Sequence, residues 1–146
     1  MNVSEVAKLR LLELTHHVRN GAQLTVVEGG SDVPFTIARV FTLRSPAGTI
    51  RGMHAHRRCS QFMICPQGAV EIVCDDAVER KMFLLDRGNL GLLVPPGVWA
   101  SETFRYDNSL LIVVCDRLYE ADDYIHDYTE FVAWRNTKIG QSAEGP

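Results

Sequence analysis

The sequence has no apolar run long enough to cross a bilayer, which takes about 18 to 20 consecutive residues. Its first stretch, residues 1–14, mixes the charged side chains of Glu5, Lys8, Arg10 and Glu13 with apolar ones, so it lacks the apolar core of a signal peptide. We therefore expect a cytoplasmic protein that does not associate with a membrane.

Basic clusters are also missing. The formal net charge is -3 and the isoelectric point is about 5.9, and no stripe of Lys and Arg alternates with aromatic residues. Binding to the phosphate backbone of a nucleic acid depends on such clusters. We therefore expect no nucleic-acid partner.

Cysteine is scarce, with 4 in 146 residues, and no two are spaced as C-x-x-C. A structural zinc site is therefore not expected, and reduced thiols fit the same cytoplasmic setting. Cys65, Cys74 and Cys115 lie in apolar stretches and are expected to be small buried residues. Cys59, close to a pair of histidines, is either a similar residue or a reactive thiol.

The chain does contain a series of short strand patterns separated by Gly, Pro, Asn and Asp. Their spacing, about ten residues, is typical of a β-sandwich or barrel. We expect one all-β domain over residues 1–146, with a core over about 20–131 and mobile ends. Residues 3–14 fit either a short helix or an opening strand, and residues 119–134 are expected to be helical from about Asp122. The expected strands are 24–28, 35–43, 51–56, 61–65, 69–74, 80–85, 90–94, 101–106 and 110–115.

Two histidines separated by one residue, His54 and His56, have the most informative spacing in the chain. On an extended strand both side chains face the same way. An apolar strand beginning at Gln61 follows, which favours an interior strand over a surface strand with solvated histidines. A convergent pair of imidazoles can bind a metal or move protons near neutral pH. By contrast His16 and His17 are adjacent, would point to opposite faces, and are expected at the surface.

Arg39 falls on the apolar face of the strand pattern at 35–43. A buried guanidinium needs an anionic partner, which is either an internal carboxylate or a ligand. Trp99 follows a Pro-Pro-Gly turn and fits both a core position and a stacking role against a base or sugar. Tyr124 and Tyr128, four residues apart, are expected to share one packed helix face.

A small β-barrel or jelly roll with His-x-His on an inner strand is the layout of a cupin. A metal-binding cupin adds a Glu shortly after the pair and a third His on a later strand. Here Gln61 stands at the first position, residues 99–102 contain no His, and His126 lies beyond the last expected strand. Two imidazoles and a neutral amide make a poor divalent-metal site. The sequence therefore favours acid–base chemistry, such as proton abstraction beside a carbonyl in a keto–hydroxy isomerisation.

The motif Arg-Gly-Met-His-Ala-His at residues 51–56 resembles that of the sugar 3,4-ketoisomerases of the WxcM-like, FdtA-type cupins. Segments 24–40, 61–65, 92–99 and 119–128 are similar as well. The resemblance implies a dimer that moves the ketone of a dTDP-4-keto-6-deoxyhexose from C4 to C3, with no metal or other cofactor. It also implies that His54 and His56 are the catalytic pair, with His56 as the base. Beside this pair we expect Arg39, Arg51, Gln61 and Trp99 to take part in substrate binding.

The chain departs from the family pattern at two places. Where the family has two tyrosines after an Arg-Val pair, one of them implicated in catalysis, this chain has Phe41 and Thr42. Ala100 stands where the family has a His or Arg tied to product stereochemistry. Three hypotheses follow: an active ketoisomerase, a non-catalytic nucleotide-sugar-binding module, and a metal-dependent cupin oxygenase. The retained histidines favour the first and the replaced residues favour the second.

Overall fold

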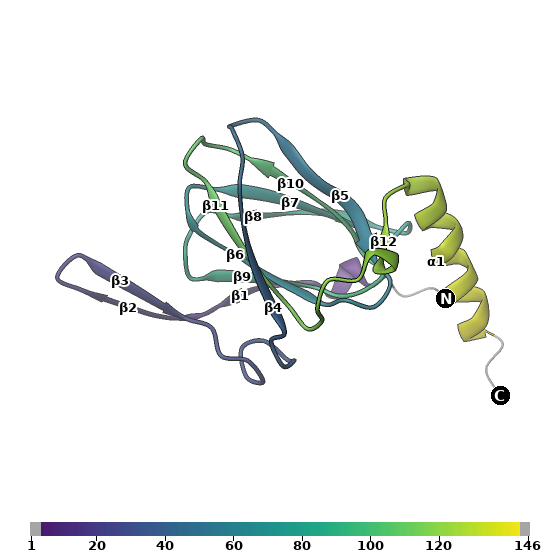
Figure 1. Ribbon diagram of the computed structural model, residues 1–146, viewed down its shortest axis with the longest axis horizontal. Coiled ribbons are helices and arrows are strands. Elements are labelled where there is room, and N and C mark those ends of the chain that lie inside the picture. The colour runs from purple at the N-terminus through teal and green to yellow at the C-terminus, as the bar shows by residue number, and fades with distance from the viewer. Residues whose placement is uncertain (1–3, 144–146) are drawn as a thin grey trace.

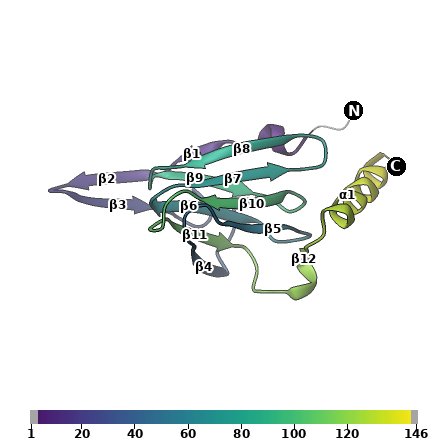
Figure 2. The same ribbon diagram turned by 90° about the horizontal axis from the view of Figure 1, so that it is seen from above.

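The computed structural model describes residues 4–143, with side chains up to residue 139. Its elements are β1 Leu11–Glu13, β2 Thr15–Arg19, β3 Ala22–Val26, β4 Arg39–Arg44, β5 Ile50–His56, β6 Gln61–Gln67, β7 Val70–Asp75, β8 Arg80–Leu85, β9 Leu90–Val94, β10 Trp99–Phe104, β11 Leu110–Cys115, β12 Tyr124–Ile125 and the helix α1 Tyr128–Ala143. Two five-stranded antiparallel sheets face each other, in the orders β1-β9-β6-β11-β4 and β12-β5-β10-β7-β8 (Figures 1 and 2). This is a jelly-roll-like sandwich rather than a closed barrel, and it confirms the expected all-β fold with a short C-terminal helical segment.

Alternation along the strands fills the space between the sheets. On β11, for example, Leu111, Val113 and Cys115 are buried while the residues between them are only half-buried. Cys65 and Cys74 are buried as expected, and Cys59 is buried too. The main core lies between the two sheets, because it joins inward residues of both.

The C-terminal segment differs from the expected helix. Ala121–Asp123 forms one 3-10 turn, Tyr124–Ile125 is the strand β12, and α1 begins only at Tyr128. The cause is a long-range pairing, in which Tyr124 lies opposite His56 and Ile125 opposite Ala55 on β5. The expectation that Tyr124 and Tyr128 share one helix face is therefore wrong. Among the described residues no helix is long and apolar enough to span a membrane.

The hairpin formed by β2 and β3 projects from the body of the sandwich (Figures 1 and 2). Its turn residues Asn20 and Gly21 both have positive φ, 52° and 80°, as a two-residue type I′ turn requires. Val18 is 64% exposed and Leu24 is 59% exposed. The hairpin therefore presents apolar side chains to its surroundings instead of packing on the sandwich.

The N-terminal segment combines the two forms that its sequence allowed, a 3-10 turn at Val6–Lys8 and then strand β1. Val6 and Leu9 are buried in the main core, so that core begins well before residue 20. Asp76, in the turn between β7 and β8, holds this segment in place. Its carboxylate accepts hydrogen bonds from Ser4 Oγ at 2.6 Å and Val6 N at 2.9 Å. It also accepts from the backbone N–H groups of residues 78 and 79 in its own turn.

Asp76→Asn tests this anchor. Burial alone would raise the pKa of Asp76, but the hydrogen bonds from Ser4 and the backbone lower it to about 2. A carboxyl whose folded pKa is depressed adds stability above its unfolded pKa, near 4, and loses it as pH falls towards 2. We expect Asp76→Asn to lower the free energy of unfolding at pH 7 by about 2 to 3 kcal/mol, and to weaken the loss of stability between about pH 4 and 2.

Urea denaturation at several pH values measures both effects. Asp86→Asn is the matched control, because Asp86 is exposed in the next turn. An Asp76→Asn protein as stable as the wild type at pH 7 would show that the carboxylate does not anchor the N-terminal segment.

Candidate active site

A β-bulge places the two histidines. Gly52 and Met53 have positive φ, 79° and 59°, and the register between β5 and β10 shifts between Ala100 and Ser101. Such a bulge bends a strand and re-aims the side chains that follow it. Beyond it, the rings of His54 and His56 lie 5.0 Å apart and edge to face, as their spacing predicts.

His56 is tied to Asp123, which the sequence analysis did not single out. The His56 Nδ1 atom lies 2.7 Å from Asp123 Oδ2, and both side chains are buried. Burial alone would raise the pKa of Asp123, but the hydrogen bonds from His56 and the backbone lower it, so the carboxyl is ionised. An ionised carboxylate only accepts, so Nδ1 carries the proton and Nε2 keeps its lone pair. That Nε2 is buried and has no hydrogen-bond partner in the described part of the chain.

His54 faces a cavity. Together with Phe41, Gln61 and Glu102 it lines a space of about 60 Å³ between the sheets. That volume holds only a few water-sized groups, so just the reacting part of a larger ligand can enter. Burial, reinforced by the neighbouring His56, lowers the pKa of His54 to about 4. His54 is therefore neutral at pH 7 and can accept a proton.

The facing sheet contributes a row of three side chains. Arg39, Cys115 and Gln61 lie directly opposite one another on β4, β11 and β6. Arg39 Nη2 approaches Cys115 Sγ at 3.6 Å and Gln61 Nε2 approaches it at 3.8 Å. The adjacent Cys59 thiol and the Arg39 guanidinium lower the pKa of Cys115. This sulfur therefore holds two of the expected substrate-binding residues in position.

Arg39 has no carboxylate partner among the residues that the structure describes. Its guanidinium lies 5.7 Å from the Tyr119 ring and 5.6 Å from the Phe41 ring, and its Nε atom is buried without a hydrogen-bond partner. Of the two partners that the sequence allowed, an internal carboxylate and a ligand, the contacts favour the ligand.

The other two expected substrate-binding residues lie elsewhere. The Trp99 ring packs edge-on against the Tyr128 ring, with the ring centroids 5.3 Å apart. It is tilted against the Phe131 ring at 5.6 Å, in the cluster beneath α1. This cluster includes Ala55, which lies between the two histidines on β5 and therefore points to the opposite face of the sheet. Trp99 packs in the same cluster, so it is on the far side of the sheet from His54. Arg51 is exposed and does not line the cavity.

Sequence reasoning missed three further side chains near the histidines. The Tyr124 ring lies 4.4 Å from that of His56 and 5.0 Å from that of His54, and Asp123 is its neighbour in the chain. Both reach the site through the pairing of a two-residue strand, which leaves no local pattern. Glu102 could have been found, because it occupies an inward position between Ala100 and Phe104 on an otherwise apolar face.

One cluster of potential metal ligands is present in the described residues. Atoms of His56, Cys59 and Asp123 lie within 4.8 Å of one another. However, His56 and Asp123 share a hydrogen bond, and the neighbouring Cys115 together with burial raises the pKa of Cys59, so its thiol keeps its proton. Metal ligands must be deprotonated, so these residues do not form a suitable site.

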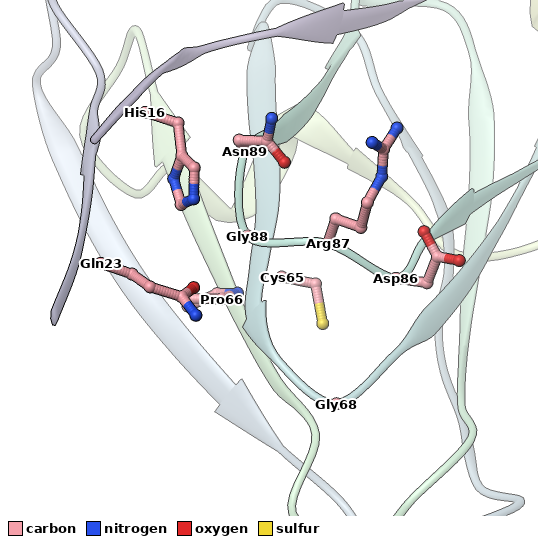
Figure 3. A pocket seen from close by; sticks show the side chains of 9 residues that line it. All are labelled: His16, Gln23, Cys65, Pro66, Gly68, Asp86, Arg87, Gly88 and Asn89. Carbon is pink, nitrogen blue, oxygen red and sulfur yellow. The ribbon is translucent and has the colours of Figure 1, made fainter. Parts of the chain in front are cut away.

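A larger cavity, of about 380 Å³, lies at the base of the hairpin (Figure 3). Its lining includes His16, Gln23, Arg87 and Asn89, and His16 pairs with the Thr25 hydroxyl at 3.0 Å. Its lining also includes Cys65 and Asp86, but it contains a single imidazole, which is bonded to the Thr25 hydroxyl. The smaller cavity is lined by His54, whose ring lies 5.0 Å from that of His56, and is therefore the candidate active site.

Comparison with known proteins identifies the family of this chain. The family model described as FdtA, WxcM-like, C-terminal, matches residues 7–136. The chain belongs to this family. It is 30% identical over 123 residues to a TDP-4-oxo-6-deoxy-alpha-D-glucose-3,4-oxoisomerase of Aneurinibacillus thermoaerophilus, which covers 84% of this chain and 88% of that protein.

Two solved structures of family members are also similar. QdtA, a sugar 3,4-ketoisomerase of Thermoanaerobacterium thermosaccharolyticum solved with TDP, has a TM-score of 0.84 and 27% identity over 89% of this chain and 96% of that chain. A 3,4-ketoisomerase of Helicobacter canadensis has a TM-score of 0.83 and 30% identity over 88% and 98%. The resemblance read from residues 51–56 and the other segments is therefore confirmed.

Replacing Asp123 by Asn tests the electrostatics of the site. Burial lowers the pKa of His56, and the Asp123 carboxylate opposes this shift. We therefore expect the pKa of His56 to fall further in Asp123→Asn, because an amide carries no charge to stabilise imidazolium. Proton titration of the labelled imidazole rings by NMR measures it. Asp122→Asn is the control, because Asp122 is exposed and bonds to Arg58. An unchanged or raised pKa of His56 would contradict the assignment of this pair.

Proposed function

We propose that this protein is a TDP-sugar 3,4-ketoisomerase that converts a TDP-4-keto-6-deoxyhexose into the 3-keto sugar. The observation that carries the proposal is a neutral His54 on the cavity wall beside the buried His56–Asp123 pair, in a chain of this family. Related enzymes support the substrate. A histidine-to-asparagine variant of QdtA was solved with TDP-4-keto-6-deoxyglucose bound.

The reaction moves a proton from C3 to C4. A base removes the C3 proton beside the C4 ketone, an enediol forms, and the protonated base returns the proton to C4. His54 fits the base, because it faces the cavity and is neutral at pH 7. The resemblance implied His56 as the base. We assign the base to His54 instead, because access to the reacting carbon is required before basicity matters.

His56 is the second histidine of the catalytic pair and lies beside His54 instead of on the cavity wall. Asp123 fixes its tautomer and orientation, so its buried and unpartnered Nε2 is available to the neighbouring His54 ring. Arg39, with no carboxylate partner, is assigned to an anionic oxygen of the substrate, and Gln61 to a sugar hydroxyl. We assign the exposed Arg51 to the diphosphate outside the cavity. We assign Trp99 to packing beneath α1.

Two rival functions are weaker. A non-catalytic binding module would explain Phe41, Thr42 and Ala100, but it leaves the His56–Asp123 pair and the cavity-facing His54 without a purpose. A metal-dependent oxygenase would need ligands that this site does not supply, because Gln61 is a neutral amide and His56 Nδ1 is bonded to Asp123. We therefore propose that no metal or other cofactor takes part.

We also propose a homodimer in the cytoplasm. An isolated two-stranded hairpin is only marginally stable in water, yet here it projects with Val18 and Leu24 exposed. The edge strand β4 also exposes Val40 on the sandwich. A second copy of the chain would cover such surfaces by strand pairing or side-chain packing. Four free thiols fit the reducing cytoplasm.

Histidine variants test the proposed activity. With TDP-4-keto-6-deoxyglucose as substrate and EDTA in the buffer, we expect the wild type to turn over. His54→Asn should lower kcat by about two to four orders of magnitude with little change in KM, because asparagine cannot carry a proton. His56→Asn should lower kcat by less, since His56 does not line the cavity. His17→Asn, on the exposed hairpin, is the control.

Three results of this assay would count against the account. Near wild-type turnover by His54→Asn would remove His54 as the base. Binding without any turnover by the wild type would favour the non-catalytic module. Loss of turnover on chelation would favour a metal-dependent enzyme.

The dimer is tested by light scattering after size-exclusion chromatography. At micromolar concentration we expect twice the chain mass of 16.4 kDa. The double variant Val18→Lys, Leu24→Lys should shift the protein towards the monomer, because two charges would be buried in the interface. Val78→Lys is the control, since Val78 is equally exposed but lies in the β7–β8 turn. A monomeric wild type would refute the proposal.

A further inference from the structure

Glu102 is a buried carboxyl that no expected role explains. It lies on β10, is only 5% exposed, and points into the cavity that His54 also lines. In the described residues 4–143 its carboxylate has neither an ion pair nor a hydrogen bond with another residue. It bonds only to its own backbone N–H, and burying a carboxyl with so little support is costly.

The backbone of β5 makes room for this carboxyl. A Cβ atom on Gly52 would lie 2.2 Å from Glu102 Oε2, so any other residue at position 52 would push the carboxyl away. Gly52 also belongs to the bulge that turns His54 inward. One local feature therefore brings His54 and Glu102 to the same cavity.

The charge state of Glu102 suits a proton carrier. Burial raises its pKa to about 7, so it exchanges a proton readily near neutral pH. The titratable neighbours are His54 from β5 and the Cys74 thiol from β7, whose pKa burial raises to about 12. Gln61 from the facing sheet is uncharged. No cation lines this cavity to hold Glu102 ionised.

The proposed isomerisation needs two proton carriers. One takes the C3 proton and delivers it to C4, and the other must take the O3 hydroxyl proton and supply one to O4. The family has a tyrosine where this chain has Phe41, and Phe41 lines this cavity with no hydroxyl to offer. Among the residues that line it, only His54 and Glu102 can carry a proton.

We propose that Glu102 is the second catalytic acid–base of this enzyme and carries the proton between the two sugar oxygens. The inference rests on the function proposed above. The protonated carboxyl of Glu102 donates to O4 as His54 removes the C3 proton, which gives the 3,4-enediol. The carboxylate then accepts the O3 proton as histidinium returns its proton to C4. The C3–H and O3–H bonds break, the O4–H and C4–H bonds form, and both residues regain their starting states.

Glu102→Gln is the direct test, because glutamine has the same shape and still hydrogen-bonds but cannot transfer a proton. We expect kcat to fall by about two to four orders of magnitude, with KM changed by less than about threefold. The wild-type kcat should decline as pH rises through the pKa of Glu102, because the acid form is required to start the reaction. That decline should be absent from the remaining activity of Glu102→Gln.

Two controls accompany it. Glu71→Gln changes a carboxyl on β7 that pairs with Arg105 at the surface, and it should keep wild-type kcat. Tyr124→Phe removes the hydroxyl of a ring that lies 4.4 Å from the His56 ring, and it should lower kcat by less than Glu102→Gln does. Glu102→Ala is the second variant, in which added formate should restore part of kcat whereas chloride at equal ionic strength should not.

The possible outcomes distinguish the role of Glu102 from the proposed function of the protein. A loss of kcat in Glu102→Gln with its altered pH profile, or formate rescue of Glu102→Ala, supports the role. Glu102→Gln turnover within about threefold of the wild type would overturn it, as would a large loss confined to Tyr124→Phe. If the wild type turns over no TDP-keto-sugar, the proposed function fails and the role of Glu102 fails with it. An active wild type with an unaffected Glu102→Gln refutes the role of Glu102 alone.

Discussion

The arrangement of this site depends on one buried hydrogen bond, between His56 on β5 and Asp123 just before β12. The two residues are 67 apart in the chain, and an unpaired imidazole and carboxylate at this depth would each be costly. Arg57 reinforces the contact by donating to the backbone carbonyls of Asp122 and Tyr124. With the segment fixed, Ile125 pairs beside Ala55 and α1 packs through Phe131. The C-terminal segment is thus part of the site.

The two sheets of the sandwich contribute different chemistry to the space between them. β5 and β10 present the groups that can exchange protons, His54, His56 and Glu102. β6, β11 and β4 hold Gln61, Cys115 and Arg39 in a cross-strand row, and we assign Gln61 and Arg39 of this row to substrate binding. The bulge at Gly52 connects these features, because it aims His54 inward and leaves room for Glu102. Replacement of the family tyrosine by Phe41 is then compatible with activity, since another proton carrier faces the same cavity.

Much of this could be predicted from local pattern. Alternating apolar residues predicted most strands of the sandwich, and the single-residue spacing of His54 and His56 predicted their convergence. Arg39 could be placed inside because it interrupts an apolar face. Trp99 could not be placed, since a tryptophan after a tight turn suits packing and stacking equally well. In the structure Trp99 packs beneath α1.

Long-range pairing explains what the pattern missed. Tyr124 and Tyr128 have helical spacing, but Tyr124 pairs with His56 on β5 and is therefore a strand residue. Asp123 carries no local signal of its partner His56, because the contact joins residues that are 67 apart in the chain. Glu102 interrupts the apolar face of β10, but the cavity that it lines depends on how the two sheets face each other. The projecting β2–β3 hairpin has an ordinary hairpin sequence, and its exposure follows because no other strand within residues 4–143 pairs with it.

The location of solvent deuterium in the product tests the central claim most directly. TDP-4-keto-6-deoxyglucose is converted in D₂O, and the product is analysed by proton and carbon NMR. Acid–base transfer by a histidine that exchanges with solvent predicts a ketone at C3 and deuterium on C4, with no deuterium on C5. A product that keeps its ketone at C4, or one that carries deuterium on C5, would contradict the account.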